Sequence, residues 1–509
     1  MSETRPLRYI VTHPDHLDDH VAARILKKEW RRLGFHLVDG MEPEILFMTE
    51  KQSREFQLEN YGVVIVGQTD VEFNDHGDKA GTSATQLIFD AIGGAEAIPE
   101  LAEIIDEVTR LDTQPGTSPL SFAEIIKSLN RSGVDPYKMS DFVGMILGAL
   151  VSAKRGFAED YQPRYRREVG ESNEWSSDYE SGDNTIPLHF FVVCPDNLDD
   201  LATLWLLMKE GSRRGFRLVD CQRPEICFMN PSDAKAFAAD FRGVVPIGMG
   251  GGQFDNNSAG TDMSAVKLAA EYLGIAKLPE FRRLVELITR CNALPESDLF
   301  HLDNVVASLC QANMDPFLVF ELVRESLDAL YTDAMEFNYG CPKEFKRTGR
   351  VEEIDGLRAA FVTSDLESMH KWIRARRQAN LIVVRRYSGH VSIFSDGSSR
   401  AGRVLENILS RLQEVELLQR HVQDKHRSKL NEELMLLIAA RNGGYIPGAR
   451  CWYFLQAEGE VKMILNGSSS HPDIEPTELS NDAVYRAVRL SVKFSAVQTS
   501  QPKAASAAE

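Results

Sequence analysis

The sequence predicts an α/β protein: a tandem repeat of a domain with a mostly parallel sheet and a helical second half, followed by a C-terminal α+β domain. Three observations predict it, namely an internal repeat, an alternation of strand-like and helix-like segments, and a last third with strands of its own. The chain has 509 residues, of which 43% are hydrophobic. This length exceeds what one hydrophobic core supports, so several globular domains are expected.

The internal repeat is the strongest of these observations. The segment that begins at His13, HPDHLDDHVAARILKKEW, aligns without a gap with the segment that begins at Cys194, CPDNLDDLATLWLLMKEG, at a constant offset of 181 residues. About 29 of the 81 columns from 13 to 93 are identical. After one deletion the match resumes in the following helical part. A repeat of this length has the size of a domain, which predicts a tandem duplication.

Within the first copy, short β-rich runs alternate with segments of helical spacing. Such alternation predicts a mostly parallel sheet covered by helices. The strand-like runs are 7–11, 35–39, 44–48 and 62–67, and the helix-like segments are 18–34 and 82–94. From Pro99 to Lys154, and again from Pro279 to Thr332, the apolar pattern is helical throughout. Each copy is therefore expected to end in helices.

The copies and the composition between them predict the domain boundaries. The polar, turn-rich stretch between the copies has the composition of a flexible linker. Beyond the second copy, strands are expected within 379–397 and 449–467, with a long helix at 401–438. The predicted divisions are a first domain 1–155, a linker 156–186, a degenerate repeat 187–335, a C-terminal α+β domain 336–495 and a disordered tail 496–509.

The sequence also predicts where in the cell the protein is located. No apolar run reaches the roughly 18 residues of a membrane span, and the N-terminus lacks the pattern of a secretory signal. A cytoplasmic protein without membrane contact is therefore expected. The seven cysteines are scattered and form no CxxC pair, which argues against a disulfide framework and against a thiolate zinc site.

The charge of the chain is unevenly distributed. The formal net charge is −18, but residues 340–450 contain 20 Lys and Arg against 13 Asp and Glu, a net of +7, which leaves −25 for the rest. This basic region is a candidate phosphate-facing surface. Within it, the stretch 371–387 mixes arginines with aromatic residues, as proteins that bind single-stranded nucleic acid do; its arginines include Arg374, Arg376 and Arg377. A solvated helix followed by a sheet edge explains the same residues equally well.

The stretch THPDHLDDH, residues 12–20, places three histidines and three aspartates directly after the first predicted strand. Sites in open α/β sheets form at this carboxyl edge. A role as helix N-cap would account fully for Asp18. The histidines need another explanation, because a cap needs no imidazole whereas metal sites combine imidazole with carboxylate.

Comparison of the two copies singles out these potential ligands. Apolar and glycine columns persist, whereas His13 is replaced by Cys194, His16 by Asn197 and Asp112 by Asn292. The same loss affects three further residues, Asp70, Asp75 and His76, which become Gly251, Asn256 and Asn257. A metal site retained in the first copy and lost from the second explains this pattern. Drift of variable surface loops is the alternative. The glycine-rich stretch 248–262 matches neither common phosphate-binding pattern, and a plain loop is expected there.

These motifs resemble the DHH phosphoesterase superfamily and, within it, the MYG-type exonuclease branch. The resemblance rests on Thr12-His13, on His16-Leu17-Asp18, on Phe73-Asn74-Asp75-His76, on Ser83-Ala84 and on Asp112. The C-terminal stretch YIPGARCWYF is similar to the small β-rich domain that ends the family.

The resemblance implies a set of site residues and an activity. The implied metal ligands are His13, His16, Asp18, Asp75 and Asp112, with Asp70 replacing an aspartate that the family has where this chain has Ile65. Asp75 and His76 would act at the scissile phosphate. Two Mn²⁺ or similar ions would generate the attacking hydroxide and stabilise the leaving oxygen. The expected function is hydrolysis of phosphodiester bonds in short RNA or a small nucleotide, and the alternative is a catalytically inactive binding or regulatory protein. The oligomeric state stays open.

Overall fold

The computed structural model divides into two compact units, Met1–Met48 with Ser53–Ala334, and Thr49–Gln52 with Met335–Glu509. Each unit is described by itself. The described residues are 5–154 except 69–70, 74–80 and 115–117; 186–423 except 189, 212–215, 219–224, 231–232, 235–242, 250–251, 257–262, 294–297 and 397; and 451–500 except 457–461 and 467–473.

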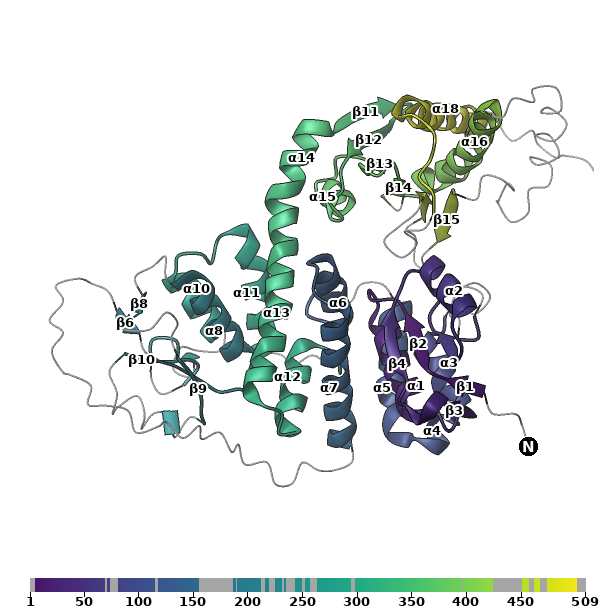
Figure 1. Ribbon diagram of the computed structural model, residues 1–509. Helices are drawn as coiled ribbons and strands as arrows, with labels where there is room; N and C mark the ends of the chain where they lie inside the picture. The colour runs from purple at the N-terminus through teal and green to yellow at the C-terminus, as the bar shows by residue number, and fades with distance from the viewer. Residues whose placement is uncertain are drawn as a thin grey trace, which may run out of the picture. The chain divides into compact units, whose positions relative to one another are not determined.

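The first half of the first unit contains a three-stranded parallel sheet in the order β4-β2-β5 (Figure 1). The predicted strand at 7–11 is divided in the structure: β1 (Arg5–Leu7) pairs with β3 (Phe35–Leu37), whereas β2 (Tyr9–Thr12) is the centre of the parallel sheet. Its neighbours are β4 (Glu44–Phe47) and β5 (Val63–Ile65). All three strands of this sheet therefore end at one edge.

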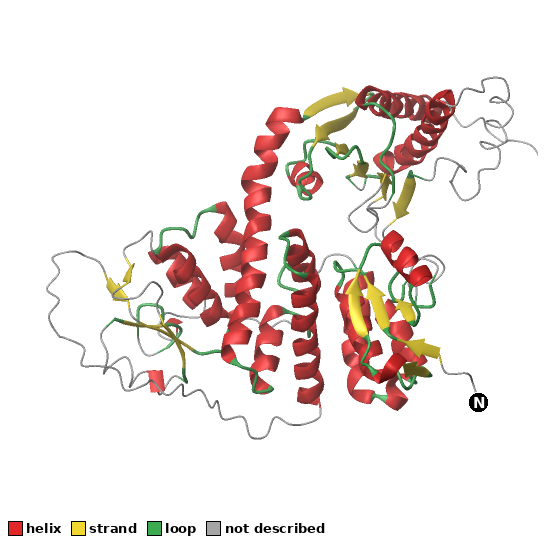
Figure 2. Ribbon diagram, viewed as in Figure 1, coloured by secondary structure: helices red, strands yellow, loops and turns green. Residues whose placement is uncertain are grey.

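Helices follow these strands as the sequence pattern predicts. The main ones are α1 (Leu17–Glu29) and α3 (Ala84–Ala91), and the short α2 (Glu50–Glu59) was not expected. Ser83 caps α3 by accepting a hydrogen bond from the Gln86 amide. After α3, the rest of this half contains helices and no strands among its described residues (Figure 2). These helices are α4 (Gly94–Ala97), α5 (Pro99–Thr113), α6 (Phe122–Arg131) and α7 (Pro136–Lys154).

The second half of the unit also contains a parallel sheet followed by helices; among its described residues no helix corresponds to α2 or α4. Its parallel sheet, β10-β7-β9, again has the first long strand at its centre. The elements are β6 (Ile186–Leu188), β7 (Phe190–Val193), α8 (Leu198–Glu210), β8 (Phe216–Leu218), β9 (Glu225–Phe228), β10 (Val244–Pro246), α10 (Ala265–Tyr272), α11 (Pro279–Ala293), α12 (Leu302–Gln311) and α13 (Pro316–Met335). The predicted α/β class with parallel sheets is confirmed.

The two halves share one hydrophobic core, which contains buried residues from Leu7 to Leu330. At their junction the Phe122 amide donates to the Phe300 carbonyl at 2.7 Å, and the Leu302 amide donates to the Leu120 carbonyl at 2.9 Å. Ser121 and His301 thus form an antiparallel bridge. Ser121 is the N-cap of α6 and His301 is the N-cap of α12. Because the bridge joins two helix starts in the same way from both sides, the junction has approximate two-fold character.

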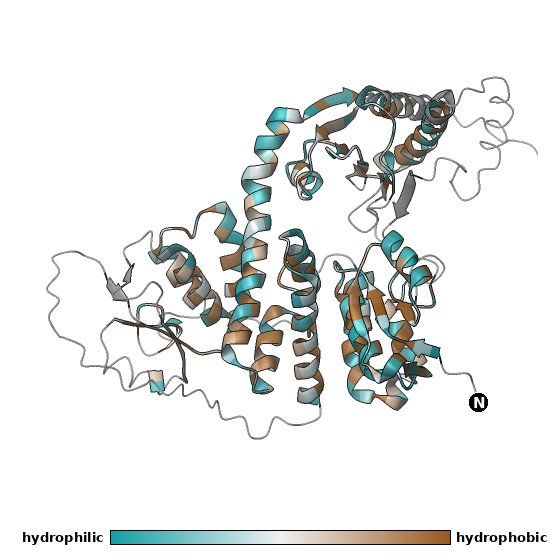
Figure 3. Ribbon diagram, viewed as in Figure 1, coloured by the Kyte–Doolittle hydropathy of each residue, from teal (hydrophilic) through white to brown (hydrophobic). Residues whose placement is uncertain are grey.

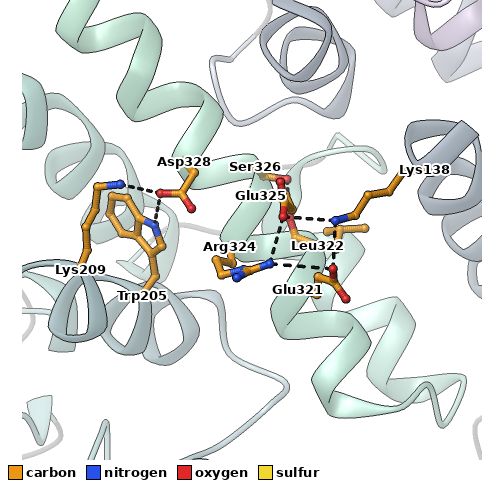
Figure 4. A network of polar contacts seen from close by, with 9 residues as sticks. All are labelled: Lys138, Trp205, Lys209, Glu321, Leu322, Arg324, Glu325, Ser326 and Asp328. Atoms are coloured by element: carbon orange, nitrogen blue, oxygen red, sulfur yellow. Dashed lines mark hydrogen bonds and ion pairs between the residues drawn. The ribbon is translucent and has the colours of Figure 1, made fainter. Parts of the chain in front are cut away.

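Ion pairs on α13 add to this junction (Figure 4). The Lys138 ammonium of α7 donates to Glu321 at 2.9 Å and to Glu325 at 3.2 Å. On another side of the same helix, Asp328 accepts from Trp205 and Lys209, both of α8. The helix therefore contacts both halves of the unit.

The second unit contains a mixed six-stranded sheet in the order β11-β12-β13-β14-β16-β15. β12 and β13 are parallel and the other neighbours are antiparallel. The strands are β11 (Arg350–Ile354), β12 (Leu357–Thr363), β13 (Leu381–Arg385), β14 (Val391–Ser395), β15 (Tyr453–Gln456) and β16 (Lys462–Asn466). The helices are η6 (Glu336–Gly340), α14 (Cys341–Thr348), α15 (Met369–Ala375), α16 (Ser399–Gln423) and α18 (Asn481–Ser500).

Packing in this unit follows the apolar pattern of its elements. Buried residues of α16 and α18 cover one face of the sheet together with Trp452. Helix α14 is largely hydrophilic (Figure 3), and its Cys341 is buried in a separate apolar cluster. The helix predicted at 401–438 is described to Gln423, and its remainder lies outside the described residues. Among the helices that the structure describes, none has the length and apolar content that crossing a bilayer requires.

Candidate functional site

Some of the residues singled out by the sequence lie just beyond the end of β2. Thr12 closes this central strand, and the loop that follows carries His13 and His16 before α1 begins. His13 is buried, with 7% of its surface exposed. An imidazole is therefore held below the surface at the carboxyl edge of the sheet, where the sequence predicted a site.

The structure brings His16 close to Asp112, which lies in the last turn of α5. His16 Nδ1 and Asp112 Oδ1 are 3.8 Å apart although the residues are 96 positions apart in the sequence. Burial alone would lower the pKa of His16, but the contact with Asp112 and the charge of Asp15 outweigh it, so that this pKa is raised. An imidazole and a carboxylate, both predicted as ligands, thus face one another.

His16 also occupies a position that usually serves helix stability. It is the N-cap residue of α1, yet its side chain makes no capping hydrogen bond. In the second half the corresponding Asn197 caps α8 by accepting from the Asp199 amide at 2.8 Å. An N-cap of this kind contributes about 1 kcal/mol. Helix α1 lacks this stabilisation, because its N-cap residue is His16.

Asp18 is not the N-cap of α1, which was the structural alternative to a role as metal ligand. Helix α1 begins at Leu17 with His16 as its N-cap, so Asp18 lies in the first turn. Its buried carboxylate instead accepts the Ala84 amide at 2.9 Å and the Thr85 amide at 3.0 Å, at the start of α3. Backbone amides at a helix start stabilise a negative charge. Asp18 therefore joins α1 to α3.

The second half repeats this connection. Asp199 accepts the Ala265 amide at 2.6 Å and the Val266 amide at 2.9 Å at the start of α10. A structural role common to both halves explains why this aspartate is the same in both. Its presence alone therefore does not distinguish a metal ligand from a structural residue.

Asp19 was missed by the sequence reasoning. Its carboxylate is buried, and the Thr12 hydroxyl, 3.2 Å from Asp19 Oδ1, is placed to donate to it. Gly67, just beyond β5, leaves room for it, since a Cβ there would lie 1.8 Å from the same oxygen. Comparison of the copies could not single out Asp19, because the second copy also has an aspartate, Asp200, at the equivalent position. Each copy also has a glycine at an equivalent position after the third strand of the sheet, Gly67 or Gly248, and this shared glycine is the signal that could have pointed to the aspartate.

His20 has a structural role. Its ring is fully buried, its Nε2 lies 2.9 Å from the Pro14 carbonyl, and it packs on Phe47. Burial lowers its pKa to about 4, so the ring is neutral at pH 7 and Nε2 carries the hydrogen that the carbonyl accepts. In the second half the same carbonyl, that of Pro195, accepts from the Cys310 thiol instead. Each half thus holds this turn with a different donor.

Replacing His20 by leucine, the residue at this place in the second half, should reduce the free energy of unfolding by about 1 kcal/mol, because the Pro14 carbonyl loses its donor. The variant should also be less sensitive to acid. A lowered pKa in the folded state means that stability is present above pH 6.5 and is lost as the pH falls towards 4. Urea unfolding at pH 7 and pH 5 measures both effects. If the change in unfolding free energy between pH 7 and pH 5 were the same in the variant and the wild type, His20 would not be the group with the lowered pKa.

The remaining predicted site residues of the first half, Asp70, Asp75 and His76, lie outside the described residues. Among the side chains that are described, no three from His, Cys, Asp and Glu lie close enough together to hold a metal ion. The described donors are of the type that Mn²⁺ accepts, imidazole and carboxylate. The space that a Cβ at Gly67 would fill is occupied by a carboxylate oxygen. The chemical nature of these side chains, imidazole and carboxylate, is thus compatible with binding of a divalent ion.

The second half has a different set of groups at the matching edge. The Cys194 thiol, in place of His13, donates to Asp196 at 2.8 Å. Burial, followed by the charges of Asp199, Asp196 and Asp255, raises the pKa of Asp200 well above its usual range. Burial likewise raises the pKa of Asp199 to about 6. Both carboxyl groups therefore bind a proton more readily than an aspartate in water.

The three predicted substrate-binding arginines have different surroundings in the second unit. Arg374 is half-buried and donates to the Ser395 carbonyl at 3.0 Å, and burial lowers its pKa. Arg376 is exposed and lies over the Trp372 ring. Arg377 is exposed, with a left-handed backbone, and its carbonyl accepts from Arg358. The guanidinium groups of Arg376 and Arg377 are thus the accessible ones.

Comparison with known proteins adds no identification to this geometry. No family model matches the sequence, and no curated protein is significantly similar to it.

Proposed function

We propose that this chain is a metal-dependent phosphoesterase of the DHH type, which uses Mn²⁺ or a similar ion to hydrolyse phosphodiester bonds in short RNA or a small nucleotide. In this proposal the chain arose by tandem duplication, the first half is catalytic, the second is a degenerate copy, and the basic C-terminal unit holds the substrate. The contact between His16 and Asp112 carries the proposal, because two residues predicted as ligands from separate motifs meet at the edge of the sheet.

The comparison of His16 with Asn197 supports a functional role for the imidazole. Asparagine at this position gives a working N-cap in the second half, so the fold accepts it. The first half has a histidine that makes no cap. Functional residues commonly stand where another residue would be more stabilising.

The proposed roles follow from chemical type. His13, His16 and Asp112 would hold the ion. If Asp18 is also a ligand, its carboxylate would bind the ion while it accepts the two amide hydrogen bonds at the start of α3. A bound divalent ion supplies a hydroxide at neutral pH and stabilises charge on the phosphate. Asp75 and His76 are the proposed catalytic pair, and the exposed Arg376 and Arg377 would neutralise phosphates of the substrate.

The decisive variant is His16→Asn, which gives the first half the residue of the second. It should raise the free energy of unfolding by about 0.5–1 kcal/mol through the new cap. It should lower the rate of Mn²⁺-dependent cleavage of a short oligoribonucleotide at least about 100-fold if the imidazole holds the ion. Urea unfolding and a cleavage assay measure the two effects on the full-length protein.

The reciprocal variant, Asn197→His, is the matched control. It should remove about 1 kcal/mol of stability and leave cleavage unchanged. Full activity in His16→Asn would show that His16 has no role in the reaction.

A binding or regulatory protein is the second candidate. It is favoured by the use that Asp18 already makes of both oxygens and by the lack of a three-residue metal cluster among the described side chains. The purified protein distinguishes the two candidates. Absence of cleavage with Mn²⁺, Co²⁺ or Mg²⁺ on RNA, single-stranded DNA and dinucleotides would favour the binding protein.

A further inference from the structure

One end of the sheet in the second unit carries four exposed arginines from three segments, namely Arg358, Arg376, Arg377 and Arg400. Arg358 lies near the start of β12, and its carbonyl accepts, at 2.8 Å, the amide of Asn380, which precedes the parallel strand β13. Arg376 and Arg377 belong to the turn that connects α15 to β13. Arg358 Nη2 donates to the Arg377 carbonyl at 2.7 Å, so these two segments are in contact.

Arg400 reaches the same end of the sheet from α16. It lies in the first turn of this helix, and its Nη2 donates to the carbonyl of Asp355, in the turn between β11 and β12. The strand before α16, β14, ends at Ser395, and the amide of the next residue, Asp396, donates to the Asn380 carbonyl at 2.8 Å. The four arginines therefore lie around the N-terminal ends of β12 and β13.

The charges of these four side chains are not neutralised inside the unit. Among the residues that the structure describes, no carboxylate forms an ion pair with any of them, and the nearby Asp396 carboxylate already accepts Asn380 Nδ2 at 2.7 Å and the Ser398 amide at 2.9 Å. A guanidinium has five N–H donors, so the single bonds made by Arg358 and Arg400 leave most of their donors for a ligand. Other arginines of the unit are paired: Arg347 with Glu344, Arg386 with Glu367 and Arg489 with Glu352.

Arg377 stands at a backbone position that favours glycine. Its φ is +50°, in the left-handed region. Its amide donates to the Arg374 carbonyl at 2.9 Å, and the Gln378 amide donates to the Ile373 carbonyl at 3.3 Å. These two bonds end α15 in a Schellman motif, in which glycine is the usual residue at this place. The chain thus has an exposed cation where the backbone alone would select glycine.

We propose that these four arginines form the surface that holds the phosphate backbone of a single-stranded oligonucleotide. The choice of ligand rests on the proposed function, and the surface adds Arg358 and Arg400 to the predicted residues and leaves out Arg374, which bonds within the unit. Arginine suits this ligand because its planar, permanently charged fork gives paired hydrogen bonds to phosphate. The neighbouring ring of Trp372 is buried beneath Arg376, so the contacts are to phosphates and carry no base preference.

Fluorescence anisotropy of a labelled oligoribonucleotide with the full-length protein in EDTA tests the proposal, because it measures binding without cleavage. Arg358→Gln, Arg377→Gly and Arg400→Gln should each lower the slope of log affinity against log salt by about 0.7, the contribution of one phosphate contact on a single strand. The same relation gives a loss of affinity of about five- to tenfold at about 50 mM salt. Arg377→Gly should be at least as stable to urea as the wild type, since glycine suits its backbone, so its loss of affinity is not explained by unfolding.

Arg347→Gln and Arg489→Gln are the matched controls. Each changes the net charge of the protein by the same amount, but removes an arginine that a glutamate already neutralises. Neither should change the salt slope. An equal fall in the controls would overturn the surface, because overall charge would then explain the binding.

The remaining outcomes separate this surface from the proposed function. Wild-type affinity and slope in the three test variants, or no binding of the oligoribonucleotide by the unmutated protein, would overturn the surface. Mn²⁺-dependent cleavage of a dinucleotide would still support the phosphoesterase in either case. Conversely, binding that the test variants weaken as expected, in a protein that cleaves no phosphodiester, would support the surface and overturn the hydrolase.

Discussion

Replacing Asp18 by alanine should reduce the free energy of unfolding by about 3–5 kcal/mol. Two backbone amides at the start of α3, those of Ala84 and Thr85, lose a buried, charged acceptor, and each such hydrogen bond contributes about 1.5–3 kcal/mol. The cap at Ser83 remains, so α3 persists but is no longer joined to α1. Urea unfolding of the full-length protein measures the loss. Wild-type stability would show that these bonds are not formed in solution.

Asp199→Ala is the natural comparison, since it removes the same connection from the second half. Its cost should depend on pH. The pKa of Asp199 is raised to about 6, so the folded state holds a proton that the unfolded state has released. This group therefore contributes stability below about pH 4 that is lost as the pH rises towards 6. The alanine variant should cost more at pH 4 than at pH 7.

Replacing Gly67 by alanine should be at least as damaging to the fold, with an expected loss of about 3 kcal/mol or more. The left-handed backbone accounts for about 1–2 kcal/mol of this. The remainder comes from the contact with Asp19 Oδ1 at 1.8 Å, which forces the carboxylate to move. Urea unfolding of the full-length protein measures the loss.

Gly34→Ala is the control that separates the cost of a left-handed backbone from the cost of the steric clash with Asp19. Gly34 has φ +72°, and nothing lies within 4 Å of its added Cβ, so its variant should show the backbone cost alone. Gly248→Ala, whose Cβ would meet Asp200 at 1.9 Å, should be as destabilising as Gly67→Ala. Adding Asp19→Ala to Gly67→Ala should recover part of the loss, because the collision disappears. Equal costs for Gly34→Ala and Gly67→Ala would refute the collision.

The sequence predicted the sheets because their strands are short apolar runs between helices, a pattern that needs no tertiary information. It could not show that the run 7–11 divides between two sheets, since both parts have the same apolar character. Helix α2 was missed for a related reason. Its residues are polar on nearly every side and only Ser53 is buried, so no apolar stripe marks it.

The candidate site was predictable in part. Comparing the copies identified His16 and Asp112 because both differ between the halves, and the structure brings them together. The same comparison could not single out Asp19, because the second half also has an aspartate, Asp200, at this place. The histidine-rich stretch 12–20 gave His20 the appearance of a ligand. His20 differs from Leu201 because the two halves hold one turn with different donors, and such compensation becomes visible only in three dimensions.

The bridge between Ser121 and His301 has a consequence for assembly. If the halves arose by duplication, a single-copy ancestor could have formed this bridge only with a second molecule, so its folded population would have depended on protein concentration. Covalent linkage makes the encounter unimolecular, with an effective concentration set by the connecting chain. Dilution then no longer separates the partners, and one partner can lose its own chemistry while it continues to support the other.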